Sequence, residues 1–199
     1  MKNGKAKIIT PERLASVILA NRDISTHPDR DEAVLYLSFR AGLRAQEIAL
    51  LEWDHVISPE GAVGVVDDQG NKCIYISKSI GKGGKERTVP MHPDVERSLR
   101  TLYIKRSSKT ERVIFGDRKR ELSPNSLQQM LRRLYLKHGL KGCSSHSGRR
   151  TFITTLARTH GDHHCSLLDV QVLAGHSNLK TTARYIEPST KSHRMISSL

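Results

Sequence analysis

The sequence predicts a mainly helical domain with a small three-stranded antiparallel β-sheet, an α+β fold. Two kinds of observation lead to this prediction. Helix starts are marked by a capping residue followed by proline, as at Thr10-Pro11 and Ser123-Pro124. Between the helical regions, short runs rich in β-branched residues are separated by turn residues, which is typical of strands.

The helices are predicted from apolar residues at helical spacing, with glycine or proline at their ends. Ala33, Val34 and Leu37 show this spacing in the second helix, and Gly42 interrupts the pattern after it. In chain order, we expect helices after the cap at Thr10, at Asp31–Phe39, in a short segment after Gly42 that carries Ile48 and Leu51 and ends near Trp53, from Pro93 to about Arg106, from Ser123 to about His138, from about His146 to His160, up to Gly175, and from about Ser177 to Ile186.

Three segments are predicted to form the sheet: "AVGVV" at 62–66, "KCIYIS" at 72–77 and "RTVPM" at 87–91. The second and third are joined by "KSIGKGGKE", a basic glycine-rich hairpin loop that carries Lys82 and Lys85 and leads to Arg87. Such a loop is either a solvated turn or a contact to DNA. It is not a triphosphate-binding loop, because Ser79 replaces the first glycine of that motif and Glu86 follows Lys85.

The charge of the chain indicates its partner. The 199 residues include 33 Lys and Arg against 20 Asp and Glu, a net charge of +13. This excess favours a polyanion, with nucleic acid the first candidate. No apolar run approaches the roughly 20 residues that span a bilayer, and no signal peptide is evident. Cys73, Cys143 and Cys165 lack paired spacing and indicate reduced thiols in the cytoplasm.

The segment "SSHSGRRTFITTLAR" places charged residues at the start of a predicted helix. On a helical wheel, Arg149 falls inside the apolar stripe with His146 on nearly the same face, whereas Arg150 lies nearer the edge. Arg149 could pair with a buried carboxylate. The alternative is an anion site, since a helix N-terminus and a guanidinium both bind phosphate. The histidine beside it favours the anion site.

Together, these motifs closely resemble the catalytic domain of the tyrosine recombinases, the family of the phage integrases. The resemblance extends from about Ile9 to about Pro188. Gly148 stands where the family usually has leucine, a departure expected to loosen this turn. The residues that match, which we call the predicted catalytic set, are Arg44 in "GLR", Lys82 in "GKGGKERTVP", His146 and Arg149 in "HSGRR", His176 in "GH", and Tyr185 nine residues later.

The resemblance implies a reaction. In that family a tyrosine attacks the scissile phosphodiester, which leaves a 3′-phosphotyrosyl link and a free 5′-hydroxyl. Tyr185 would be the nucleophile, and Arg44 and Arg149 would bind the non-bridging oxygens. Lys82 would protonate the leaving 5′-oxygen. The chemistry is coherent, because a phenol with a pKa of about 10 needs cations and a base nearby to react near neutral pH.

The resemblance also implies supporting roles. His146 would assist proton transfer, His176 would donate a hydrogen bond to the phosphate, and Glu47 would orient Arg44 or His146. Further DNA contacts are expected at Lys85, Arg87, Arg150, Lys180 and Arg184. Positioned cations can serve phosphoryl transfer, so we expect no metal and no cofactor. The segment "THGDHHC" offers metal-binding residues, but adjacent ligands seldom fit one tetrahedral centre, and we interpret it as a polar loop.

We expect residues 1–199 to form a single catalytic domain, with a core at about 9–188 and a tail at 189–199 that exchanges between protomers. The N-terminal core-binding domain of larger family members is not expected. The chain is either a fragment or a short member, like the recombinases that invert fimbrial promoters. The expected partner is double-stranded DNA at specific recombination sites, with a dimer or tetramer on DNA and a monomer free in solution.

Three functions remain open. The first is a site-specific recombinase that carries out integration, excision or inversion. The second is a non-catalytic DNA-binding regulator that keeps the fold, and the third is a topoisomerase-like enzyme that relaxes DNA by the same chemistry. Completeness of the predicted catalytic set favours the first over the second.

Overall fold

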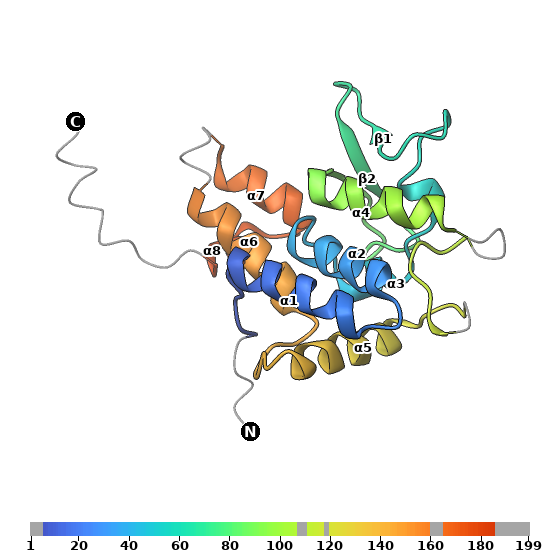
Figure 1. The fold of residues 1–199 in the computed structure, drawn as a ribbon. Helices are drawn as coiled ribbons and strands as arrows, with labels where there is room; N and C mark the ends of the chain where they lie inside the picture. The colour runs from blue at the N-terminus through green and yellow to red at the C-terminus, as the bar shows by residue number, and fades with distance from the viewer. Residues whose placement is uncertain (1–5, 107–110, 118–119, 160–164, 186–199) are drawn as a thin grey trace. The chain divides into compact units, whose positions relative to one another are not determined.

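The computed structural model describes residues 6–106, 111–117, 120–159 and 165–185 of the chain. The chain divides into two compact units, Met1–Phe152 and Ile153–Leu199, and the division falls inside helix α6 (Ser147–Thr159). The described elements are mainly helices, with one three-stranded antiparallel sheet in the first unit (Figure 1). The predicted fold class is therefore confirmed.

Two helices of the first unit begin where the capping signals place them, whereas the helix expected from Asp31 begins three residues earlier, at Pro28. Thr10 caps α1 by accepting a hydrogen bond from the Arg13 backbone N–H at 3.3 Å, and Ser123 caps α5 through the Ser126 N–H at 3.1 Å. The helical elements that lie wholly in this unit are α1 (Pro11–Ile24), α2 (Pro28–Phe39), α3 (Ala45–Ala49), the 3₁₀ turn η1 (Trp53–His55), α4 (Pro93–Ile104) and α5 (Pro124–Lys137).

Helix α2 is the centre of the first unit. It packs against α1, α3 and α4, and α3 packs in turn against α5 (Figure 1). Because neighbours cover several of its sides, Ala33, Val34, Leu35 and Leu37 are all completely buried. The end of α2 is fixed by this packing, and it leads directly into the turn before α3.

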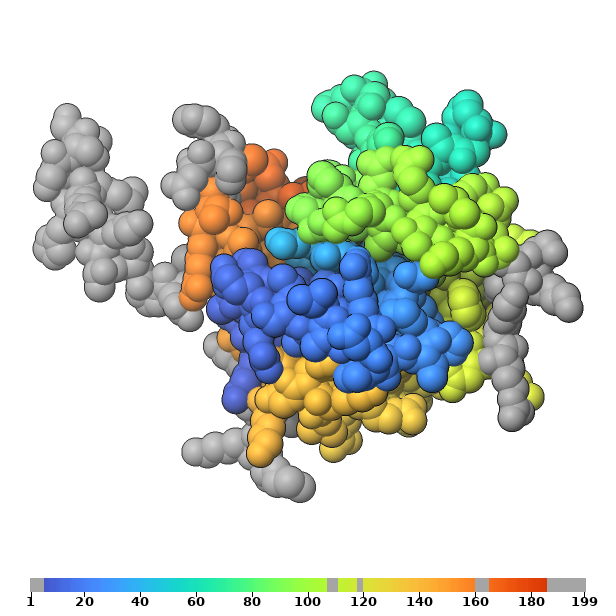
Figure 2. All heavy atoms as spheres, in the orientation of Figure 1, coloured from blue at the N-terminus to red at the C-terminus, as the bar shows by residue number. Residues whose placement is uncertain are grey.

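The sheet has the strand order β1-β2-β3, with β1 at Val65–Val66, β2 at Lys72–Ile76 and β3 at Arg87–Pro90. Ile76 lies opposite Arg87 in the register, so the hairpin loop leaves the sheet beside this pair. The buried face includes Ile74, Ile76 and Val89. Figure 2 shows that the segments around β1 and β2 project beyond α4 on the face in view.

One predicted helix is divided in the structure. The short helix expected after Gly42 and ending near Trp53 is observed as α3 followed by η1, because the chain between them pairs with another strand-like segment. The Trp53 N–H donates to the Glu111 carbonyl at 3.0 Å, and the Val113 N–H donates to the Leu51 carbonyl at 2.9 Å. Extended pairing across residues 51–53 is incompatible with a continuous helix.

The second unit contains the rest of α6, α7 (Leu167–Ala174) and α8 (Leu179–Ala183). Helix α7 packs against α8 and begins with a reciprocal cap between Ser166 and Asp169. It ends at Gly175, whose φ of 58° is left-handed, and this stop turns the chain at His176. Within the described residues, no helix combines the length and the hydropathy needed to cross a bilayer.

Candidate functional site

The turn that presents Arg44 requires glycine at position 42. Gly42 has a φ of 62°, and a Cβ built on it would lie 2.2 Å from Cδ1 of Phe152. The left-handed backbone and the aromatic ring both exclude a larger residue. Ala41 and Leu43 are both buried, so the turn is anchored on both sides of Gly42. Arg44 follows at the start of α3, with its side chain 19% exposed.

Glu47 is completely buried in α3 and binds two arginines. Its Oε1 accepts hydrogen bonds from Arg44 Nη1 at 2.8 Å and from Arg87 Nη1 at 2.9 Å. Its Oε2 accepts from the Arg44 backbone N–H at 2.8 Å and from Arg87 Nη2 at 2.9 Å. Burial would raise the pKa of this carboxyl, but the hydrogen bonds and charges of Arg87 and Arg44 outweigh it and lower the pKa to about 2. Glu47 is therefore an anion that orients Arg44.

Arg149 lies in the first turn of α6 and is only 7% exposed, whereas Arg150 is half-buried. Nη1 of Arg149 donates to the Gly42 carbonyl at 2.7 Å, which ties this guanidinium to the turn that carries Arg44. Nη1 of Arg150 donates to the Ala6 carbonyl at 2.8 Å. The core-side position of Arg149 on the helical wheel is thus confirmed, and the first unit brings both arginines of the predicted set to one turn.

Gly148 follows exposed His146 by two residues and lies against the end of α2. A Cβ at this position would lie 2.1 Å from Ser38 Oγ and 2.8 Å from Phe39 Cδ2. The expectation that glycine loosens this turn is therefore wrong. The missing side chain lets the first turn of α6 pack directly on α2, which holds that turn in place.

The loop between β2 and β3 exposes Lys82 and Lys85. Its base is compact, because the Gly81 N–H donates to the Ser77 carbonyl at 2.9 Å and a Cβ at Gly81 would lie 2.0 Å from the Lys85 carbonyl oxygen. The Ser77 hydroxyl is also hydrogen-bonded to Nε2 of buried His55 at 2.9 Å. The two ammonium groups therefore extend from a fixed base.

His176 and Tyr185 lie beside one another in the second unit. Their rings stack with centroids 5.9 Å apart and an interplanar angle of 23°. Nδ1 of His176 shares a 2.9 Å hydrogen bond with Oγ1 of Thr182, which is completely buried. Lys180 and Arg184 are exposed on and just after α8. The second unit thus brings together the predicted nucleophile and the predicted hydrogen-bond donor to phosphate.

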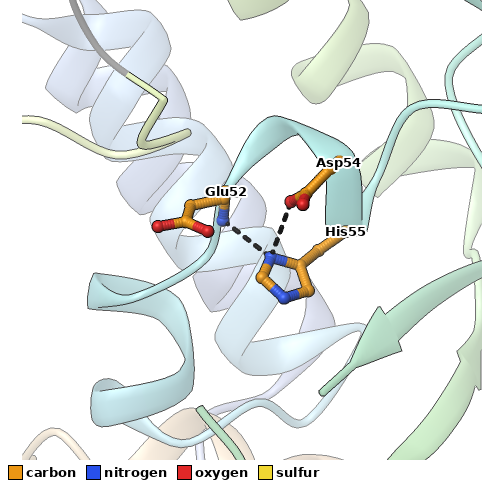
Figure 3. A group of neighbouring side chains, drawn as sticks. All are labelled: Glu52, Asp54 and His55. Carbon is orange, nitrogen blue, oxygen red and sulfur yellow. Dashed lines mark hydrogen bonds and ion pairs between the residues drawn. The ribbon is translucent and has the colours of Figure 1, made fainter. Parts of the chain in front are cut away.

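Glu52, Asp54 and His55 form a cluster of potential metal ligands that the sequence reasoning did not identify (Figure 3). Nδ1 of His55 accepts a hydrogen bond from the Glu52 backbone N–H at 3.1 Å, and Nε2 is bonded to Ser77. The Glu52 carboxylate pairs with Arg112 at 2.9 Å. Because both ring nitrogens are engaged, the cluster fits a cap of η1 better than a metal site.

Arg87 is engaged within the first unit. The sequence predicts a DNA contact for this residue, and in the structure its guanidinium faces Glu47 and its side chain is 9% exposed. Strand periodicity carried the missing signal, since Arg87 shares a face of β3 with buried Val89. Two other predictions lie outside the described residues: most of the "THGDHHC" segment, at 160–164, and the tail at 189–199.

Comparison with known proteins agrees with this architecture. Residues 7–192 match the sequence profile of the Phage integrase family. Tyrosine recombinase XerA of Thermococcus kodakarensis is 32% identical over 177 residues, covering 87% of this chain and 54% of that protein. Tyrosine recombinase XerC of Alcanivorax borkumensis is 32% identical over 162 residues, covering 78% and 47%. The chain therefore spans about half the length of these curated relatives.

Solved structures share the fold. A crystal structure of XerA recombinase superposes with a TM-score of 0.69 at 20% identity, covering 98% of this chain and 65% of that one. A pre-cleavage complex of XerH site-specific recombinase with its difH substrate gives a TM-score of 0.72 at 21% identity, covering 98% and 55%. At these identities the likeness concerns the fold.

Proposed function

The chain belongs to the phage integrase family, and we propose that it breaks and rejoins double-stranded DNA at specific sites through a 3′-phosphotyrosyl intermediate. The observation that carries this proposal is the attachment of Arg149 to the carbonyl of Gly42, two residues before Arg44. Two guanidinium groups anchored on one turn suit a single phosphate. The names of the curated relatives, both tyrosine recombinases, support the same reaction class.

In the proposed step, the phenol oxygen of Tyr185 attacks the scissile phosphorus and the bond from phosphorus to the 5′-oxygen breaks. The phenol proton passes to a base, for which His146 is the candidate, and Lys82 gives a proton to the leaving 5′-oxygen. Arg44 and Arg149 stabilise the negative charge on the non-bridging oxygens. Attack by the free 5′-hydroxyl reverses the step, so rejoining conserves the energy of the bond that was broken.

The second unit contributes the nucleophile and its neighbour. A phenol is a weak nucleophile while it keeps its proton, so the groups around Tyr185 must favour loss of that proton as the bond to phosphorus forms. His176 stacks against Tyr185, and its ring is held through Thr182. We propose that this ring donates a hydrogen bond to the phosphate while its neighbour attacks.

The proposed partner is DNA, with assembly as a dimer or tetramer on the recombination sites. Exposed Lys85, Lys180 and Arg184 are the candidates for contacts to the DNA backbone. Within residues 1–199 we propose one catalytic domain. A cytoplasmic location is proposed as well, and the free thiols of all three cysteines support it.

The test is covalent capture on DNA. The protein is incubated with sheared genomic DNA of the source organism, and detergent is added to trap covalent protein–DNA complexes. The DNA ends attached to the protein are then sequenced to obtain a cleavage site. A nicked duplex of that site should give a protein–DNA adduct with the wild type and none with Tyr185→Phe. Specific binding without any adduct would favour the non-catalytic regulator, and relaxation of supercoiled DNA without strand exchange would favour the topoisomerase-like enzyme.

A further inference from the structure

Arg87 makes a contact that differs from those of the other hairpin cations. It opens β3 directly after the loop that carries Lys82 and Lys85. Its two terminal nitrogens donate to the two carboxylate oxygens of Glu47, both at 2.9 Å. This parallel arrangement uses the planar fork of arginine, which lysine cannot reproduce. With its side chain 9% exposed, Arg87 faces the protein interior.

The same carboxylate holds Arg44. Glu47 receives four hydrogen bonds, two from Arg44 and two from Arg87, which accounts for the acceptor sites of a carboxylate. Because the carboxylate is completely buried, it can remain charged only while these cations compensate it. The positions of Arg44 and Arg87 are therefore coupled through one anion, although 40 residues separate Glu47 from Arg87.

Arg87 also connects Glu47 to the hairpin loop, because it lies at the end of the β2–β3 ladder. Arg87 lies opposite Ile76 in the last pair before the loop, and Ile76 is completely buried. Lys82 is exposed and makes no hydrogen bond or ion pair with any residue that the structure describes. The location of its ammonium group is therefore set by the base of the loop, and Arg87 forms one side of that base.

We propose that Arg87 is a positioning residue for DNA cleavage: through Glu47 it fixes where the Lys82 loop leaves the sheet relative to Arg44. This inference rests on the proposed function, because it assigns Lys82 the transfer of a proton to the leaving oxygen. A contact between Arg87 and DNA is the competing role. Engagement of both terminal nitrogens by Glu47 argues against that role.

The experiment compares two forms of the captured site, one with the natural oxygen at the 5′-bridging position of the scissile phosphate and one with sulfur. A thiol has a pKa of about 8.5, against about 15.7 for water, so a sulfur leaving group needs little help from an acid. Rates of adduct formation are measured for the wild type, Arg87→Met and Lys82→Ala. Arg30→Met is the matched control, because Arg30 is also 9% exposed and paired, but with Asp31.

Arg87→Met is expected to slow cleavage of the oxygen substrate by about 10²-fold, the lower end of what general acid catalysis contributes. Cleavage of the sulfur substrate should fall much less, so the sulfur-to-oxygen rate ratio rises about tenfold or more, as in Lys82→Ala. In Arg30→Met the ratio should stay at the wild-type value. If Arg87→Met lowers the melting temperature too far for assay, Arg87→Lys replaces it, and its ratio should also rise.

If the wild type forms the adduct and the sulfur-to-oxygen rate ratio of the Arg87 variants equals that of the wild type, the inference is overturned and the proposed function stands. Equal loss on both substrates would assign Arg87 to general folding or to DNA binding. Absence of any wild-type adduct on either substrate would remove the proposed function, and the inference with it.

Discussion

Gly148 shows how one residue sets the position of the first turn of a helix. A Cβ there would lie 2.1 Å from Ser38 Oγ, a distance at which one of the two segments must move. Glycine inside a helix costs about 1 kcal/mol relative to alanine, so its presence here needs a compensating gain. Close packing of the first turn of α6 on the end of α2 supplies that gain.

Gly148→Ala is therefore expected to destabilise the protein by about 1–3 kcal/mol, even though alanine is the better helix former. Urea unfolding of the wild type and the variant measures the change. The control is the Ser38→Ala background, which removes the nearest atom. The cost of Gly148→Ala should be smaller there, and an equal cost in both backgrounds would contradict the packing argument.

For single residues, the sequence predicts the face of a helix on which a side chain lies, but not its distant partners. Arg149 could be placed on the core side, because helical periodicity alone sets the face of a residue. Its partner, the carbonyl of Gly42, lies 107 residues away and could not be predicted from local pattern. Basic neighbours in the loop favour a DNA contact for Arg87, whereas its contact with Glu47 is again non-local and could not be predicted from the loop.

At the level of elements, local signals predict starts and stops well. Capping by Thr10 and Ser123 marks α1 and α5, and Gly175 ends α7. The division between α3 and η1 was missed, since it depends on pairing of residue 52 with residue 112. The bounds of an element are thus predictable where the residues that determine them lie within a few positions, and not where pairing with a distant segment determines them.

The link between α3 and β3 through Glu47 predicts a pH dependence of stability. The pKa of this carboxyl is about 2 in the folded protein, against an ordinary value of 4.5. A carboxylate whose pKa is lowered by folding stabilises the folded state fully above 4.5, and this stabilisation is lost as the pH falls towards 2. The amount is on the order of 3 kcal/mol.

Unfolding free energies of the wild type and Glu47→Gln, measured from neutral pH down to about pH 2.5, test this prediction. The difference in unfolding free energy in favour of the wild type should be largest near neutral pH, and it should shrink below about pH 4.5. Other carboxylates titrate equally in both proteins, so they cancel in the difference. A margin that stays constant over this range would contradict the ion-pair account of Glu47.

For the whole molecule, the net charge of +13 predicts that DNA affinity depends strongly on salt. Fluorescence anisotropy with a labelled duplex should show a linear fall of log K with log salt concentration. Neutralising exposed Lys180 or Arg184 should reduce the slope by about 1. Arg22→Gln is the control, because Arg22 already pairs with Glu32 at 2.8 Å. A slope near zero would contradict electrostatic binding of DNA.

The most direct test of the reaction is to locate the covalent bond. The chain has five tyrosines, and only Tyr185 is the predicted nucleophile. The captured adduct is digested with nuclease and trypsin, and the nucleotide-bearing peptide is sequenced by mass spectrometry. A 3′-linked nucleotide on the peptide that begins at Tyr185 is the predicted result. A nucleotide on another residue, or a 5′-linkage, would contradict the mechanism.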